Sequence, residues 1–341
     1  MEKLGTNKLN MQKLLAPAAL VILYIVFSIF GNNFLSLDMV KNILESSYYI
    51  GFMAFGVTFV IITGGTAMMC AALLGGFSFK QGCPLILSVF LTILVGVVFG
   101  FANGIFVAKL KLPPFIATLG TQMMASGIGS IITKVQSQTW PTATAEVGSW
   151  FKKVFIRSEV FGIKGFPVGA FWLIGFFLIA AAILHKTKFG RYAYAIGSNE
   201  EAARLSGIKV DNWKVAVYTL SGFFVGMAGL FYAAAYTTIT PGTGSGQELN
   251  GITGVIIGGT SMAGGSGSMM GTLIGVFIMS VLKNGLSSCG LQAPWQTFLT
   301  GAVLLDITRT NAANRVTPVV TTPKNGGKQP SIERSDAFDK K

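Results

Sequence analysis

The sequence predicts an all-α, polytopic membrane protein with about ten transmembrane helices, some of them short or broken. Of its 341 residues, 51% are hydrophobic and only 11% are charged, whereas soluble domains carry about 25% charged residues. The apolar residues gather in recurring stretches, and a helix needs about 20 predominantly apolar residues to cross a bilayer. The 43 glycines suit close contacts between helices in lipid.

The apolar stretches give the positions of the expected helices. They lie near residues 14–30, 43–63, 66–80, 84–107, 115–132, 166–185, 214–240, 249–262, 268–288 and 293–306. Those at 66–80, 249–262 and 293–306 are short for a bilayer, so we expect these helices to be tilted, broken or re-entrant.

The first stretch follows Lys3, Lys8 and Lys13, as the apolar part of a signal peptide would. The sequence GNNFLSLD that comes after it offers no small-x-small cleavage site. We therefore expect this stretch to remain as the first transmembrane helix.

Basic residues predict the orientation. With the N-terminus in the cytoplasm, 18 of the 26 Lys and Arg residues fall on the cytoplasmic side, as the positive-inside rule favours. The loop at 133–165 carries basic residues on the other side, but long loops weaken the rule. The predicted organisation is a cytoplasmic N-terminus at 1–13, a transmembrane domain at 14–306 in the cytoplasmic (inner) membrane, with a cytoplasmic loop at 186–213, and a cytoplasmic tail at 307–341. The polar tail has the composition of a disordered segment.

The net charge of +13 does not indicate a nucleic-acid partner, because the basic residues lie between apolar stretches and in the tail. Cys70, Cys83 and Cys289 have no metal-ligand spacing and are odd in number. We expect them to pack as small apolar residues, with no metal site and no disulfide framework.

No catalytic constellation is visible. The only histidine, His185, precedes Lys186 at the edge of an apolar stretch, where we expect an interfacial anchor. Glycine-rich runs such as GGTSMAGGSGS lack the Gly-Lys-Ser/Thr ending of a phosphate-binding loop. We therefore expect no enzyme activity, no cofactor and no ATP hydrolysis by this chain itself.

Glycines recur at four-residue spacing, which aligns them on one face of a helix and lets two backbones approach closely. The sets are Gly96, Gly100 and Gly104; Gly222 and Gly226; and Gly267, Gly271 and Gly275. The spacing suits packing within the chain, and it also suits a subunit interface.

Two short sequences resemble each other: IITGGTAM at 61–68 and VIIGGTSM at 255–262. Each Gly-Gly pair falls at the end of an apolar stretch that we orient from outside to inside. Two broken helices in corresponding places would indicate a transport site between two halves of the chain. The Asn-Gly pairs at 103–104 and 284–285 do not keep this register.

The polar stretch GRYAYAIGSNEEAARLSGIKV at 190–210 interrupts the apolar sequence. Ser198 and Glu201 fit a capping box, Glu200 stands four residues before Arg204 as in a helical ion pair, and Gly207 suits a left-handed helix end. These features predict a helix at about 199–206, roughly 12 Å long. Such a helix is too short to be stable alone, so it needs a partner surface, either its own membrane domain or another protein.

Three long stretches carry a resemblance to a known family. They are KTKFGRYAYAIGSNEEAARLSGIKV at 186–210, TTITPGTGSGQELNGITGVIIGGTSMAGGSGSMMGTLIGVFIMSVLKNGL at 237–286 and GFANGIFVAKLKLPPFIATLGT at 100–121. The chain resembles, from about residue 34 to 306, the permeases of sugar-importing ABC transporters of the ribose/galactose/xylose type.

The resemblance implies a homodimeric or heterodimeric permease in membrane lipid. It also implies two partners, a cytoplasmic ATP-binding subunit that binds the ATP and an extracytoplasmic solute-binding protein. The helix that would dock into the ATPase is formed by Ser198, Asn199, Glu200, Glu201, Ala202, Ala203, Arg204, Leu205, Ser206 and Gly207.

The chain departs from the family pattern at two positions. The family usually reads close to GGIDLSVG where this chain has GGTAMMCA at 64–71, so Ala67 replaces an Asp. The family also usually reads ELD where this chain has Glu248, Leu249 and Asn250. These losses remove two acidic positions near the membrane path and bear on the substrate rather than on the fold.

A neutral, hydroxyl-rich solute suits the polar residues of the apolar stretches, which offer hydrogen bonds without charge. The possible path residues are Gly64, Gly65, Asn103, Thr118, Thr121, Gln122, Asn250, Gly258 and Gly259. Each of these could equally make a polar contact between helices. The sequence does not identify the sugar, because recognition in such systems is expected mainly on the binding protein.

Two other function classes fit the sequence less well than an ATP-driven importer. A secondary transporter of a small polar solute, with no ATPase partner, usually needs ionisable residues inside the membrane. The stretches contain almost none, since Glu45, Asp306 and Lys283 lie at or near ends. A membrane enzyme would need a nucleophile and a base, and neither is visible.

Overall fold

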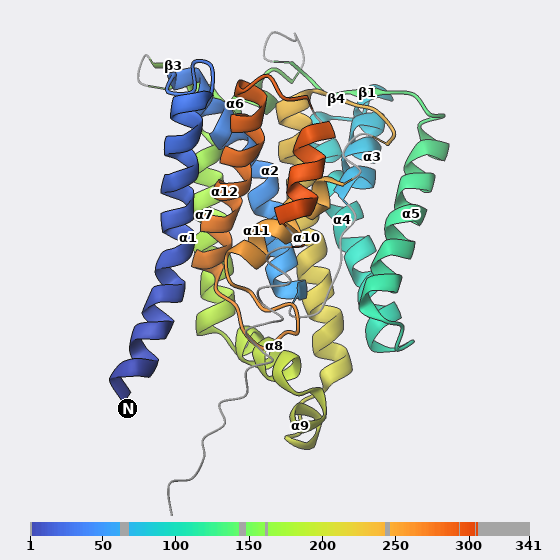
Figure 1. Ribbon diagram of the computed structural model, residues 1–341. Helices are drawn as coiled ribbons and strands as arrows, with labels where there is room; N and C mark the ends of the chain where they lie inside the picture. Colours follow the sequence, from blue (N-terminus) through green and yellow to red (C-terminus); the bar gives the residue numbers. More distant parts are fainter. Residues whose placement is uncertain are drawn as a thin grey trace, which may run out of the picture.

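The computed structural model describes residues 2–61, 68–142, 148–160, 163–242, 246–292, 294–303 and 305. The described chain is almost entirely helical, and most helices stand side by side between two ends of the molecule (Figure 1). The long helices are α1 (Glu2–Phe30), α2 (Leu37–Ile61), α4 (Leu85–Ala108), α5 (Pro114–Ile132), α7 (Gly169–Lys186), α10 (Val210–Tyr236) and α12 (Met269–Ser288). The shorter ones are α3 (Met68–Lys80), α6 (Trp150–Phe155), α8 (Lys188–Ser198), α9 (Glu200–Leu205), α11 (Gln247–Ile257) and a helix at 294–303.

The predicted all-α fold class is confirmed. Each predicted apolar stretch contains a helix, and six described helices are long and apolar enough to cross a membrane. The helices in the stretches 66–80 and 249–262, α3 and α11, are short, as predicted. The small amount of strand forms two antiparallel pairs, β1 (Gln138–Thr139) with β4 (Thr238–Ile239) and β2 (Ser158–Val160) with β3 (Ile163–Phe166).

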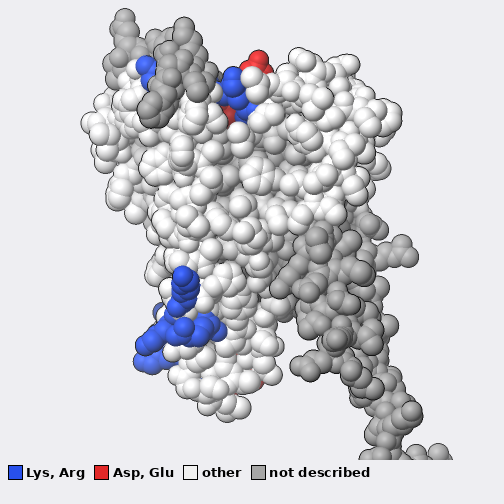
Figure 2. Space-filling model, turned by 90° about the vertical axis from the view of Figure 1, so that its left-hand side faces the viewer, with Lys and Arg blue, Asp and Glu red and all other residues white. Residues whose placement is uncertain are grey.

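The two ends of the bundle differ. We call the end that carries α8 and α9 the α9 face and the opposite end, with α6 and the strand pairs, the α6 face (Figure 1). The connections at the α9 face are residues 109–113, 187–209 and 258–268, and those at the α6 face are residues 31–36, 81–84, 133–142, 148–168, 237–242 and 289–292. In Figure 2, charged side chains gather toward these ends and leave an uncharged band between them, as expected for a chain that spans a bilayer.

Helix α2 lies at the centre of the bundle and is almost wholly buried. Its aromatic side chains pack on α10, with Phe52 stacked on Phe231 at 4.6 Å between ring centroids and Phe59 stacked on Phe224 at 6.0 Å. Outer helices such as α5 and α7 leave large apolar side chains exposed, for example Phe115 and Phe171. Apolar exposure of this kind suits lipid or a partner helix.

Helices α4 and α10 touch through their glycines. A methyl group added at Gly100 would lie 2.5 Å from the carbonyl oxygen of Tyr218 and 2.7 Å from Cα of Gly222. One added at Gly226 would lie 2.8 Å from Cα of Ile93. The four-residue spacing in these helices therefore serves packing within the chain.

Helix α12 packs in the same way on α11 and on Gly258, the C-cap of α11. A methyl group at Gly258, Gly271 or Gly275 would lie closer than 3.0 Å to backbone atoms of the facing segment. The prediction that Gly267 shares a helix face with Gly271 and Gly275 is wrong. The helix begins only at Met269, because the hydroxyl of Ser268 caps it by accepting a hydrogen bond from the amide of Gly271 at 3.2 Å.

We expect Gly100→Ala to destabilise the folded chain, since the added methyl group must displace the backbone of α10, and overpacking of this kind typically costs about 1–3 kcal/mol. Gly120 of α5 is a matched control because a methyl group there meets nothing within 4 Å. Gly120→Ala should be neutral or stabilising, since Ala exceeds Gly in helix propensity by about 1 kcal/mol. Thermal unfolding in detergent measures both variants. Equal melting temperatures would contradict the close packing of α4 on α10.

Candidate functional site

The predicted short helix is present at the α9 face as α9, but its N-terminal cap differs from the prediction. The N-cap is Asn199, whose side-chain oxygen accepts a hydrogen bond from the amide of Ala202 at 3.0 Å. Ser198 is instead the last residue of α8, so the capping box of Ser198 and Glu201 is wrong. The cause is that a preceding helix, α8, extends to Ser198, so Ser198 is itself helical, and Asn serves as well as Ser at an N-cap.

The predicted C-terminal end of α9 at Gly207 is confirmed. Gly207 has a φ of +81°, in the left-handed region that favours glycine. Its amide donates to the carbonyl of Arg204 at 3.0 Å, and the amide of Ile208 donates to the carbonyl of Ala203 at 3.2 Å. These two bonds form a Schellman motif, which ends the helix and turns the chain toward α10.

Ion pairs hold α9 to the first turns of α10. Glu200 accepts from Arg204 at 3.3 Å, as predicted, and from Lys214 at 2.5 Å. Arg204 also pairs with Asp211 at 3.4 Å. The hydrogen bond from Lys214 is the main reason why the pKa of Glu200 is lowered, against the opposing effect of partial burial. Glu200 therefore stays ionised at neutral pH and fixes the direction of α9.

One side of α9 is packed and the other is open to solvent. Ala203 is buried in a small apolar cluster with Ile196 of α8 and Val210 of α10. Leu205 points away from this cluster and is 88% exposed. An exposed leucine beside exposed Glu201 gives α9 a free outer surface that a partner protein could cover.

The segment before α12 lies against α8. The hydroxyl of Tyr194 donates to the carbonyl of Gly267 at 2.7 Å. A methyl group added at Gly264 would lie 2.8 Å from the carbonyl oxygen of Gly197, and one at Gly265 would lie 2.8 Å from Cα of Ser198. Helix α8 therefore connects α9 directly to the segment that follows Gly258 and leads into α12.

Four of the possible path residues make polar contacts within the bundle. Asn103 and Thr121 are buried and bonded to each other, with Thr121 Oγ1 donating to Asn103 Oδ1 at 2.7 Å between α5 and α4. Thr118 donates to the carbonyl of Phe115 in its own helix, and Asn250 donates to Gln247 at 3.0 Å. These are polar contacts within or between helices.

The other described path residues are Gln122, Gly258 and Gly259, and Gln122 follows Thr121 directly in α5. Gln122 Nε2 of α5 donates to Glu248 Oε1 of α11 at 2.7 Å, and Glu248 also accepts from the amide of Gly246 at 3.1 Å. Gly258 ends α11 and packs on Gly271, while Gly259 follows with a φ of +88°. Gly64, Gly65 and Ala67 lie outside the described residues.

The sequence placed Lys283 near the end of an apolar stretch, but its tyrosine partners, in the half of the bundle nearer the α6 face, were not predicted. Lys283 of α12 donates to the hydroxyl of Tyr49 at 2.5 Å and to that of Tyr236 at 3.1 Å. It also lies 5.2 Å and 5.7 Å from the centroids of these two rings. Within the described ranges Lys283 forms no ion pair, and two of its three N–H donors are used by the tyrosines. A lysine inside an apolar stretch is the signal that could have found this cluster.

Comparison with known proteins gives consistent results. Residues 39–308 match the family described as "Branched-chain amino acid transport system / permease component". The chain is 38% identical over 301 residues to the Ribose import permease protein RbsC of Bacillus subtilis, covering 86% of this chain and 91% of that protein. Identity to RbsC of Escherichia coli K12 is 35% over 298 residues, or 84% and 89% of the two chains.

A relative named for another cargo is nearly as similar. The Autoinducer 2 import system permease protein LsrC of Photorhabdus luminescens is 31% identical over 310 residues, which cover 87% of this chain and 89% of that protein. No solved structure matches the chain.

We expect Asn199→Ala to loosen α9, because removing an N-cap side chain typically costs about 1 kcal/mol. Ser198→Ala should change little, since Ser198 does not cap α9. Hydrogen exchange of peptides covering 199–207 measures both variants, and exchange should rise about fivefold in Asn199→Ala only. Faster exchange in Ser198→Ala than in Asn199→Ala would contradict the assigned cap.

Proposed function

Because the chain belongs to the transport-system permease family whose model its residues 39–308 match, we propose that it forms the membrane path of an ATP-driven importer for a monosaccharide or a similar small hydroxylated solute. The observation that carries this proposal is the geometry of α9, a short capped helix with one fixed side and one open side. Its open side is the surface on which a cytoplasmic ATP-binding subunit docks.

The proposal places the α9 face in the cytoplasm. The support is the positive-inside rule, since 18 of the 26 Lys and Arg residues of the chain fall on this side in the predicted orientation. Those in or next to the connections at this face are Lys109, Lys111, Lys186, Lys188, Arg191, Arg204 and Lys209. In this orientation residues 1–13 and the tail at 307–341 are cytoplasmic, and the α6 face receives the solute-binding protein.

Motion of the ATPase reaches the membrane domain by two routes. The ion pairs of Glu200 and Arg204 pass a displacement of α9 to α10. The hydrogen bond from Tyr194 to Gly267 passes a displacement of α8 to the segment before α12. Both routes are short and consist of bonded groups, so a rigid-body movement of α9 moves helices that cross the bilayer.

The solute class rests on two polar clusters and on the relatives. Lys283 with Tyr49 and Tyr236 combines aromatic rings with hydrogen-bonding groups, and Gln122 with Glu248 adds an amide and a carboxylate. Sugar hydroxyl groups donate and accept hydrogen bonds, and few precisely placed polar groups in an apolar path are typical of small-molecule sites. The relatives named above import ribose or autoinducer 2. A second permease copy, identical or homologous, completes the assembly.

The test is a charge placed on the outer side of α9. Leu205→Asp should abolish co-purification of the ATPase and reduce uptake at least tenfold, because a buried unpaired carboxylate in the interface costs several kcal/mol. The matched control is Leu35→Asp, since Leu35 is 68% exposed at the opposite face. The control should keep the ATPase bound.

Two results would contradict the proposal. One is unchanged ATPase binding by Leu205→Asp. The other is uptake that stops when the proton gradient is collapsed while ATP is maintained, which would favour a secondary transporter.

A further inference from the structure

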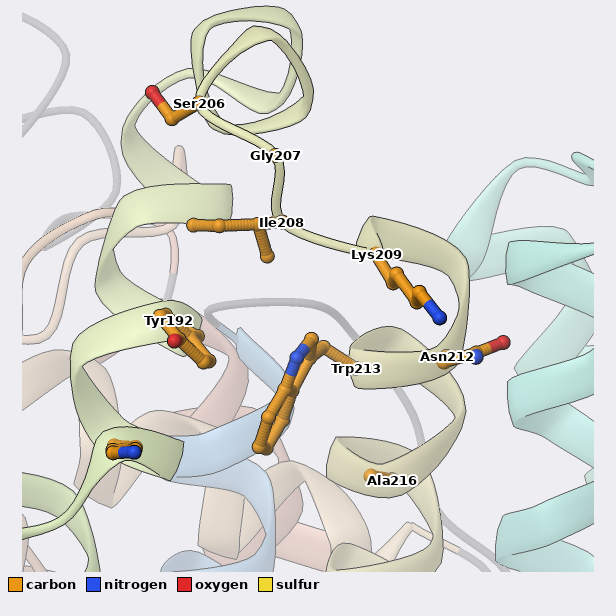
Figure 3. Close-up of a pocket in the computed structure, with 9 residues that line it drawn as sticks. Tyr192, Ser206, Gly207, Ile208, Lys209, Asn212, Trp213 and Ala216 are labelled. Atoms are coloured by element: carbon orange, nitrogen blue, oxygen red, sulfur yellow. The ribbon is translucent and has the colours of Figure 1, made fainter.

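A cavity of about 810 Å³ opens between α8, the segment after α9 and the first turns of α10 (Figure 3). Its lining includes Lys188, Tyr192, Ile208, Lys209, Asn212 and Trp213. Figure 3 shows Trp213 and Tyr192 at the centre of the cavity, with Lys209 and Asn212 on the α10 side. The residues whose bonds form the two routes described above do not line the cavity.

The cavity combines an aromatic interior with unneutralised positive charge. Tyr192 and Trp213 pack edge to face, with ring centroids 4.8 Å apart. Lys188 and Lys209 form no ion pair with any described residue, because the nearby carboxylates of Glu200 and Asp211 are bonded to Arg204 and Lys214. The chemistry favours an anion that also carries an apolar part.

The position of the cavity identifies the source of such an anion. Helix α10 is long and apolar enough to cross a membrane and begins at Val210, while the sequence places the cytoplasmic loop up to residue 213. Asn212, Trp213 and Ala216 therefore lie at the boundary between the two. Trp and Tyr are enriched at this depth, where headgroups meet acyl chains. Basic cavities between helices at the cytoplasmic side bind anionic headgroups. An acidic segment of a soluble partner would instead be expected at the exposed tip of α9, further from the bilayer.

We propose that this cavity binds the headgroup of an anionic phospholipid. Lys188 at the start of α8 and Lys209 at the start of α10 attract the phosphate by their charge, and the first acyl carbons rest on Trp213. The same lining includes Gly207, which ends α9. A bound lipid therefore braces the turn that sets the direction of the coupling helix. The proposal concerns a lipid site and stands independently of the identity of the solute.

The test is native mass spectrometry of the purified full chain after delipidation, titrated with phosphatidylglycerol or phosphatidylcholine. The unaltered protein should bind phosphatidylglycerol in preference. The double variant Lys188→Gln, Lys209→Gln should lose affinity at least about tenfold, since each basic residue contributes roughly a factor of five near an anionic lipid. Lys109→Gln, Lys111→Gln changes the net charge by the same amount at the same face and should bind like the unaltered protein.

Further measurements distinguish a lipid from the other candidate occupants of the cavity, a free anion and a partner protein. Inorganic phosphate at millimolar concentration should not displace the lipid, because it lacks the acyl contact with Trp213; displacement would mean that the site takes a free anion. Equal loss in the two double variants, or equal binding of phosphatidylcholine, would overturn the proposal. Unchanged lipid binding by Lys188→Gln, Lys209→Gln together with lost ATPase binding would assign the cavity to the partner protein.

Discussion

The close packing of α10 between α4 and α2 is the constraint on which the rest of the structure depends. One side of α10 carries Gly222 and Gly226 and lies backbone to backbone on α4. The other side carries Phe224 and Phe231, which stack on aromatic rings of α2. In lipid there is no hydrophobic driving force between helices, so close van der Waals packing of this kind provides the association. Helix α10 cannot shift without moving the centre of the bundle.

Because α10 is fixed in this way, the attachments of α8 and α9 link the α9 face to the centre of the bundle. Glu200 and Lys214 attach α9 to the first turns of α10, and Tyr194 attaches α8 to the segment at 264–267. That segment continues into α12, whose glycines pack on α11 as closely as those of α4 pack on α10. Under the proposed coupling, a force applied to α9 acts on two tightly packed helix pairs, and three of their helices, α10, α11 and α12, contact α2.

The local sequence was sufficient to predict the structure where one residue type is strongly preferred for a particular backbone conformation. Gly207 was predicted because only glycine adopts its left-handed turn without strain. The cap of α9 was misplaced by one residue, since Ser198 and Asn199 are equally good caps and the sequence does not show how far α8 continues. The bond between Gln122 and Glu248 joins residues 126 positions apart, and local periodicity contains no signal for it. Lys283 could have been found as a charge within an apolar stretch, but its tyrosine partners come from two other helices.

The most direct test of the central claim is the amount of solute transported per ATP hydrolysed by the reconstituted transporter with Tyr194→Phe. This variant removes only the hydrogen bond to Gly267 and leaves α9 and its open surface intact. The account predicts normal ATPase binding, with the ratio of solute to ATP reduced several-fold, while Tyr24→Phe in α1 keeps the normal ratio. An unchanged ratio in Tyr194→Phe would contradict the claim that α8 transmits movement of the ATPase to the segment before α12.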